Sequence, residues 1–142
     1  MRVAAYYLLG AGLLLNSTGI NAASPSKEQV LKNMSHELVE CIAYYGIVIE
    51  GAEKEKEYAL AHKYNQVLDK VIEMAIYAGL AAGLNDEAQV ARLDIAKKTL
   101  SKKIEHNLSN IAILNKEYSV VCKEAVEYPD KRVEYWYSKL DK

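Results

Sequence analysis

The sequence predicts an all-α fold, an antiparallel bundle of three to four helices plus a short C-terminal helix, with one inter-helix disulfide. Three observations predict this fold. The body of the chain is rich in Ala, Leu, Glu and Lys, which are good helix formers. Only two prolines occur in 142 residues, Pro25 and Pro129, and both lie at the edges of the helical region. Apolar residues recur every three or four positions, the spacing that places them on one face of a helix.

Residues 1–23 have the three parts of a secretory signal peptide: a basic start, an apolar run over residues 3–15 and an exit of small residues. The apolar run is too short to cross a bilayer, which takes about 20 apolar residues. We expect a cut between Ala22 and Ser24 that leaves a single exported domain, residues 24–142. An uncleaved N-terminal membrane anchor is the alternative.

The first helix is expected from Lys27 to about Ile49. Ser26 is a good N-cap residue, and Gln29 three positions later completes a capping-box pattern. Gly51 is expected to end the helix. The apolar face steps by three and four residues and consists of Leu31, Met34, Leu38, Cys41, Tyr45 and Ile49.

The second helix is expected from about Glu53 to Ala82, and Gly83 suits its end. The charges of residues 53–57 alternate in sign, which indicates a solvated turn or a first helical turn. Its last turns are crowded with alanine and glycine, which let a neighbouring helix approach closely. Its apolar face consists of Leu60, Tyr64, Val67, Val71, Met74 and Ala78.

A third helix is expected after Asn85, an N-cap residue followed by two acidic side chains that suit the positive end of a helix. No Pro or Gly interrupts residues 85–128. One helix of that length would extend about 65 Å and overhang the first helix. A break near residues 107–110 is therefore expected, because Asn and Ser compete for backbone hydrogen bonds. The fourth helix would then cover about residues 110–127; a single long bent helix is the alternative.

Pro129 is expected to break the fourth helix, and a short terminal helix would begin at Asp130. A free helix of about ten residues is unstable in water, so this segment should dock on the bundle or on a partner.

Two cysteines occur, Cys41 in the first helix and Cys122 in the last long one. An even count in an exported chain argues for a disulfide. It would join these two helices and close a loop of about 80 residues. Two buried free thiols are the alternative. A redox-active pair is disfavoured, because the chain has no CxxC motif.

The charge excludes one class of partner. The leader holds one of the 18 basic residues and none of the 19 acidic ones, so the remaining chain carries a net charge of about −2. Nucleic-acid binding needs a clear basic excess, so we expect no nucleic-acid partner. No helix has a strongly basic polar face, which disfavours a membrane-surface protein. We also expect no stable membrane insertion after the leader is cut.

The candidate site residues carry no known catalytic motif. Residues 36–40 resemble the zinc-protease motif H-E-x-x-H, but the fifth position is Glu40. Glu37 and Glu40 could act as an acid and base pair, although surface carboxylates more often meet a basic residue, for which Arg92 is a candidate. A pocket between helices could be lined by Glu37, Glu40, Tyr44 and His106. We expect no metal and no cofactor.

The aromatic tail offers a further candidate. Trp136 lies between two tyrosines and would either seal the core or form the centre of a protein-binding surface, where Trp and Tyr are favoured.

Three segments carry a resemblance: residues 37–45, residues 107–111, and Val121–Glu124 together with Pro129, Arg132 and Tyr135-Trp136. As a set they resemble small uncharacterised exported helical proteins of bacteria and their phages. The resemblance covers about a third of the chain and includes no catalytic motif. It implies a bacterial periplasm and adds support for a Cys41–Cys122 link.

These observations predict a periplasmic or secreted protein that serves as a non-enzymatic interaction module for an unknown protein partner. A helical bundle that binds a small molecule or a metal is the alternative.

Overall fold

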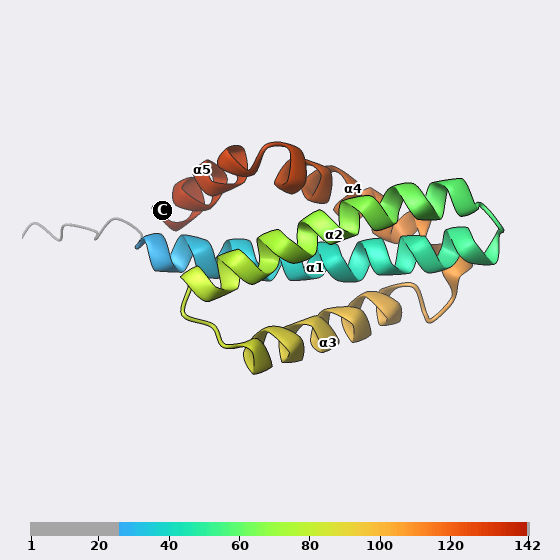
Figure 1. Ribbon diagram of the computed structural model, residues 1–142, viewed down its shortest axis with the longest axis horizontal. Coiled ribbons are helices and arrows are strands. Elements are labelled where there is room, and N and C mark those ends of the chain that lie inside the picture. Colours follow the sequence, from blue (N-terminus) through green and yellow to red (C-terminus); the bar gives the residue numbers. More distant parts are fainter. Residues whose placement is uncertain (1–25, 142) are drawn as a thin grey trace, which may run out of the picture.

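The structure of the protein is a computed structural model that describes residues 26–141 (Figure 1). The predicted leader, residues 1–23, lies outside the described residues. Five α-helices and one 3-10 helix follow one another, and no strand occurs within residues 26–141, so the all-α prediction is confirmed. The helices are α1 (Lys27–Lys54), α2 (Tyr58–Ala81), α3 (Asp86–Lys103), the 3-10 helix η1 (Leu108–Asn110), α4 (Ala112–Glu127) and α5 (Pro129–Leu140).

Helix α1 is the centre of the bundle. It packs against each of the other helices, and half of its 28 residues are buried. Helix α2 runs antiparallel to α1, and α3 runs in the same direction as α1 (Figure 1). Helices α4 and α5 run antiparallel to α1 on another side of it (Figure 1). Successive residues are buried in α1, for example Tyr44 and Tyr45, as expected for a helix covered on several sides. The sequence pattern predicted only one of these buried faces.

Two predicted helix starts are confirmed by their capping hydrogen bonds. The Ser26 hydroxyl accepts from the Gln29 backbone N–H at 3.1 Å, and the Asn85 side chain accepts from the Ala88 N–H at 2.8 Å. Each cap satisfies one of the N–H groups that the first turn of a helix leaves without a partner.

The predicted boundary between the first two helices is wrong by several residues. Helix α1 continues through Gly51 to Lys54, and the turn falls at residues 55–57, where Lys56 has a φ of 62°. A side chain at Gly51 would lie 3.3 Å from the Ile111 side chain, so this glycine permits close packing inside the helix. Of residues 53–57, the last three form the exposed turn that was one of the two expectations, and the first two belong to the end of α1.

The third and fourth helices are separate, as the break at residues 107–110 predicted. Glu105 and His106 both have positive φ angles, which end α3. The Asn107 side chain then accepts from the Ser109 N–H at 3.0 Å and caps η1. Helix α5 begins at Pro129 itself, because proline is well tolerated at the first position of a helix, where its missing N–H costs nothing.

The predicted disulfide is present. Cys41 on α1 and Cys122 on α4 are bonded, their Cα atoms are 5.4 Å apart, and both are buried in the core. Tyrosine fills much of the space around them: Tyr44 packs against Tyr45 and Tyr118, and Tyr45 packs against Tyr64. Among residues 26–141, no helix is both long and apolar enough to cross a membrane.

Candidate functional site

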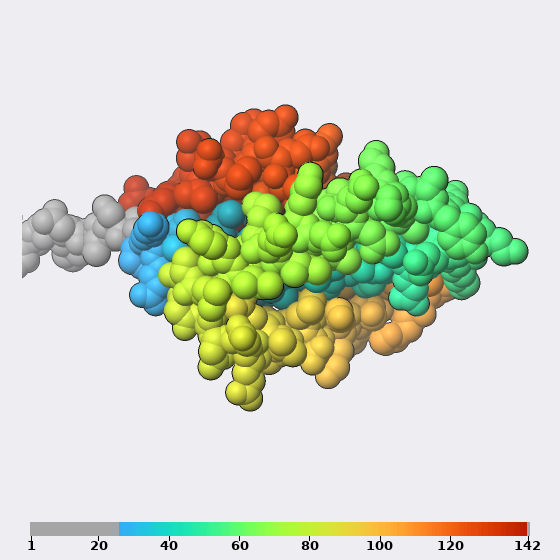
Figure 2. Space-filling model, in the orientation of Figure 1, coloured from blue at the N-terminus to red at the C-terminus, as the bar shows by residue number. Residues whose placement is uncertain are grey.

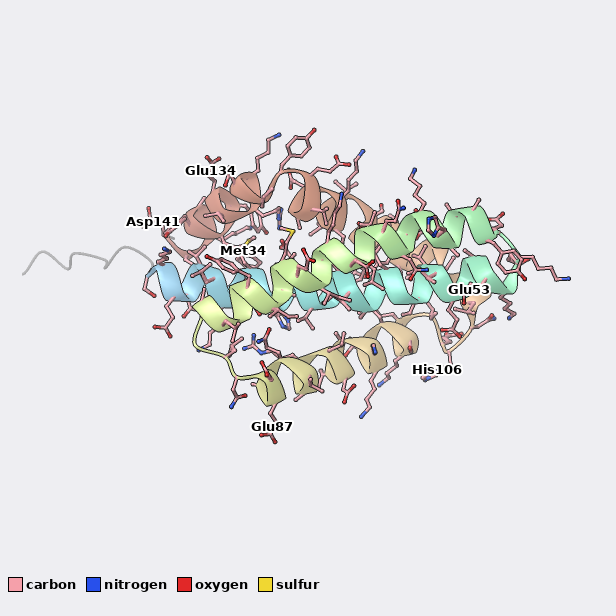
Figure 3. The ribbon with its side chains drawn as sticks, viewed as in Figure 1. Met34, Glu53, Glu87, His106, Glu134 and Asp141 are labelled. Carbon is pink, nitrogen blue, oxygen red and sulfur yellow. A yellow bond between two sulfur atoms is a disulfide. The ribbon has the colours of Figure 1, made fainter. Side chains whose placement is uncertain are left out.

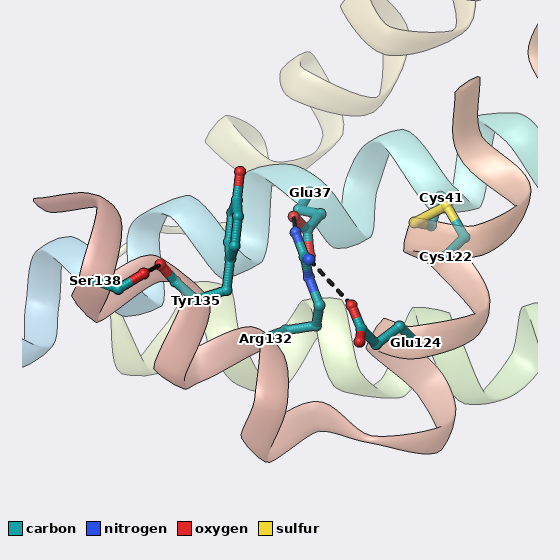
Figure 4. A network of polar contacts seen from close by, with 7 residues as sticks. All are labelled: Glu37, Cys41, Cys122, Glu124, Arg132, Tyr135 and Ser138. Carbon is teal, nitrogen blue, oxygen red and sulfur yellow. Dashed lines mark hydrogen bonds and ion pairs between the residues drawn. A yellow bond between two sulfur atoms is a disulfide. The ribbon is translucent and has the colours of Figure 1, made fainter.

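A buried network of charged side chains ties α5 to α1 and α4 (Figure 4). Both carboxylate oxygens of Glu37 accept from the Arg132 guanidinium, at 2.9 Å from Nε and 2.5 Å from Nη2. The Nη1 of Arg132 donates to Glu124 at 3.1 Å. Glu37 and Arg132 are each only 7% exposed, so this is an ion pair inside the protein. Bidentate contact of this kind fixes both position and orientation.

The electrostatics of Arg132 follow from these contacts. Its hydrogen bonds to Glu37 raise the pKa of the guanidinium further above its ordinary value, with a smaller contribution from Glu124. The guanidinium carbon also lies 4.1 Å from the centre of the Tyr135 ring, within the range of a cation–π contact. Arg132 is therefore held on three sides.

The basic partner predicted for Glu37 is wrong. Arg92 was the candidate, but the structure places Arg132 there. A signal existed in the sequence: Arg132 precedes Trp136 by four residues, so both fall on one face of a helix. The apolar side expected for the terminal helix consisted of Val133, Trp136, Tyr137 and Leu140, and it left Arg132 out.

Glu37 and Glu40 do not form an acid and base pair in the structure. Both oxygens of Glu37 are occupied by Arg132, so neither is free for a substrate. The Glu40 side chain is 32% exposed, and its carboxylate lies 3.8 Å from Nε2 of His36. The two glutamates thus have separate partners.

The structure brings together some of the predicted site residues and separates others. Glu37, Glu40 and Trp136 line one hollow of about 370 Å³. Tyr44 lies elsewhere: it is buried, and its hydroxyl donates to Asn115 Oδ1 at 2.9 Å. His106 lies on the exposed loop after α3, at the opposite end of the molecule from Met34 of α1 (Figure 3). The pocket proposed from Glu37, Glu40, Tyr44 and His106 is therefore not assembled.

No candidate metal centre is found in the described chain. Within residues 26–141, no three His, Cys, Asp or Glu side chains come together in a group that could hold an ion.

Trp136 lies on the side of α5 that faces the bundle. Its ring meets that of Tyr135 edge to face, with the ring centres 5.2 Å apart. Its indole Nε1 is buried and has no hydrogen-bond partner among the described residues. In this environment, Trp136 anchors α5 on the rest of the bundle.

An apolar groove that the sequence analysis missed lies between α2 and α5, and α1 forms its floor. In the space-filling view, α1 is seen in the depth between the other two helices (Figure 2). We call this feature the α2–α5 groove; its volume is about 490 Å³. Among the described residues that line it, Glu73 alone carries a charge. The lining residues are Leu31, Met34, Leu38, Glu73, Met74, Tyr77, Ala78, Pro129 and Val133.

A second hollow adjoins this groove on the far side of Tyr77. It lies between the start of α1 and the end of α2, and we call it the terminal hollow. Tyr77 lines both hollows and is 77% exposed, and Leu80 beside it is 56% exposed. The described residues that line the terminal hollow are Lys27, Glu28, Leu31, Lys32, Tyr77, Leu80, Ala81, Ala82, Gly83 and Leu84.

Comparisons with protein-family models, curated proteins and solved structures found no match for this chain. Any assignment of function therefore depends on the site geometry and the sequence.

Proposed function

We propose that this chain is an exported, disulfide-linked interaction module that binds a protein partner through the α2–α5 groove and performs no chemistry of its own. The observation that carries the proposal is the groove itself, an apolar depression with exposed aromatic and aliphatic side chains at its edge.

The composition of the groove supports protein binding. Met34 and Met74 lie within it, and methionine adapts its shape to a partner surface. Tyr77 stands at its edge, and aromatic residues are enriched in protein interfaces. Ile76 and Leu80 are about half exposed on the same helix, α2. Contiguous apolar surface of this kind marks interaction sites on soluble domains.

The polar network supports a role without catalysis. Glu37 is fully occupied by Arg132, and Arg132 is shared between Glu37 and Glu124. The three side chains come from α1, α5 and α4, and their contacts hold these helices together. The buried charges thus stabilise the packing of these helices. The α2–α5 groove is then the surface that we assign to partner binding.

Export is supported by the signal-peptide pattern and by the disulfide, since disulfides persist in oxidising compartments. The resemblance to exported bacterial proteins favours the periplasm. N-terminal sequencing of the exported protein tests this part of the proposal. We expect the first residue to lie between Ala22 and Ser24, whereas a chain that starts at Met1 or Arg2 would contradict it.

Site-specific photo-crosslinking tests the groove. A photoreactive phenylalanine analogue would replace Tyr77 in one variant and Val120 in the control, in the cells that encode the chain. Val120 is a matched position, since it is 73% exposed on α4 and lines neither hollow. We expect a discrete protein adduct from position 77 and none from position 120. Equal adducts from both positions, or none from position 77, would refute the proposed binding surface.

A further inference from the structure

We infer that the partner in this groove is a second copy of the chain, packed across a two-fold axis at Tyr77 with the two α2 helices antiparallel. This inference rests on the proposed function and names its partner.

The surface around Tyr77 has both a projection and a place to receive it. Tyr77 projects into solvent, and hollows lie on both sides of it. A two-fold interface uses the same patch on both subunits, so that patch must be complementary to itself. A ridge flanked by two hollows meets this requirement, because the ridge of each copy can enter a hollow of the other.

The side chains along α2 are matched in size about the same point. In an antiparallel pair centred on Tyr77, the residue three positions before it comes opposite the residue three positions after it, because both lie on the same side of the helix as Tyr77. Leu80, which is 56% exposed, then lies over Met74 in the partner's groove. A large exposed side chain thus meets a recessed one.

The charges are matched in the same arrangement. Glu73 lies on the groove side of Tyr77, and Lys27 and Lys32 lie in the terminal hollow on its other side. The two-fold axis exchanges these sides, so Glu73 of each copy faces the lysines of the other. Glu28 shares the terminal hollow, which leaves a net charge of +1 in its lining opposite Glu73. Complementary potentials of this kind set the register of an interface.

The size of the surface predicts a reversible dimer. The two hollows are lined by 17 different residues among those described. A standard stable interface uses about 20–30 residues on each side. We therefore expect a reversible dimer and not an obligate one.

Sedimentation equilibrium of the disulfide-intact chain without its leader tests this inference, over about 1 µM to about 1 mM. We expect a concentration-dependent equilibrium between monomer and dimer. Tyr77→Ala should weaken it at least about tenfold, as for truncation of a central interface tyrosine. Tyr58→Ala is the matched control: Tyr58 is 66% exposed on the same helix and lines neither hollow.

A charge exchange provides the second test. Glu73→Lys should weaken the dimer, and adding Lys27→Glu and Lys32→Glu to that variant should restore it, since both partners are then reversed. A monomer at every concentration, or a dimer equally sensitive to Tyr58→Ala and Tyr77→Ala, would overturn the inference. If the crosslinked adduct from position 77 has a mass other than twice that of the chain, the dimer is refuted and the proposed function is supported. If position 77 gives no adduct, both are refuted.

Discussion

At the residue scale, the Glu37–Arg132 pair shows how a buried charge can hold an element in place. Removing two charges from water is costly, and the cost is offset only when both are well paired. Here two parallel hydrogen bonds, a third to Glu124 and the ring of Tyr135 surround the guanidinium. The pair therefore specifies where α5 docks more than it adds to the total stability.

Removing one partner should destabilise the protein more than removing both. We expect Arg132→Met to lower the free energy of unfolding by about 3 kcal/mol, because Glu37 is left buried and unpaired. The double variant Glu37→Leu with Arg132→Met should recover most of that loss. Urea unfolding followed by far-UV circular dichroism measures both values.

An exposed ion pair provides the control for this comparison. Lys123 and Glu127 are 3.9 Å apart and largely exposed. Lys123→Met should change the free energy of unfolding by less than about 1 kcal/mol. A double variant at Glu37 and Arg132 as unstable as the single one would show that the loss comes from packing and not from the unpaired charge.

The buried tyrosines predict a loss of stability at alkaline pH. Burial, with a smaller contribution from the neighbouring Tyr64, raises the pKa of Tyr44 and of Tyr45 to about 12. A raised pKa in the folded state means that the contribution is complete below the unfolded pKa of about 10. That contribution is lost as the pH rises from about 10 through about 12.

Tyr44→Phe tests this titration. The variant lacks the hydrogen bond to Asn115, so it should be less stable than the wild type by about 1 kcal/mol at neutral pH. Phenylalanine does not titrate, so the difference should shrink above about pH 10. Urea midpoints measured at about pH 8 and about pH 11 compare the two regimes. A difference that is constant with pH would contradict the raised pKa of Tyr44.

Sequence alone identified several of these residues but not their partners. The Cys41–Cys122 bond could be predicted because a chain with two cysteines offers only one intramolecular pairing. The partner of Glu37 could not, because 95 residues separate it from Arg132. Their meeting depends on how α5 turns after Pro129, and no local spacing encodes that turn.

At the element scale, α5 depends on the rest of the bundle for its stability. It has 12 residues, and an isolated helix of that length is marginal in water. Its inward face carries Arg132 and Trp136, while Tyr137 is 38% exposed. The two roles considered for Trp136, sealing the core or forming a binding centre, therefore predict different outcomes.

Trp136→Ala should lower the free energy of unfolding by about 2 kcal/mol. This loss is smaller than that for a fully buried tryptophan, because Trp136 is only partly buried. The loss should appear as faster hydrogen exchange over residues 129–140, since α5 loses its apolar anchor. Tyr137→Ala on the same helix should cost less. An unchanged melting temperature in Trp136→Ala would instead favour a binding role for this side chain.

The helix ends show the limits of element prediction. Ser26 and Asn85 were identified because their capping preference is local and strong. The end of α1 was misplaced because Gly51 fits two roles, helix termination and close packing, and its contact with Ile111 decides between them. The break after α3 could be predicted from Asn107 and Asn110, because their side chains bond to nearby backbone groups.

At the scale of the whole molecule, the disulfide joins two helices that are far apart in the sequence. Cys41 and Cys122 are separated by 81 residues. In the chain-entropy account, closing a loop of that size stabilises the folded state by about 4.5 kcal/mol.

The double variant Cys41→Ala with Cys122→Ala should therefore lose about 4 kcal/mol of stability, and reduction of the wild type should have a similar effect. Unfolding in denaturant, with and without reductant, compares the three states. Alkylation of the unreduced, unfolded wild type should modify no thiol. Modification of both cysteines in that test would show that the bond does not form.

The overall arrangement was predictable only in part. The number of helices and the alternating directions of the first four follow from the positions of breaks and caps. The central position of α1 and the α2–α5 groove could not be predicted in this way, because both depend on how the other helices pack around α1. Leu31, Met34 and Leu38 were correctly assigned to an apolar face, yet part of that face forms the floor of an open groove.

The position of the disulfide has a consequence for survival among proteases. Residues 41–122 form a covalently closed ring that contains both connecting loops around α3, at residues 82–85 and 104–111. Exposed loops are where proteases first cut a folded chain. A cut in either loop opens the ring without separating the fragments, because the bond between α1 and α4 still links them. The nicked protein still joins the two segments that carry Glu37 and Arg132, so a single cut in either loop releases no fragment.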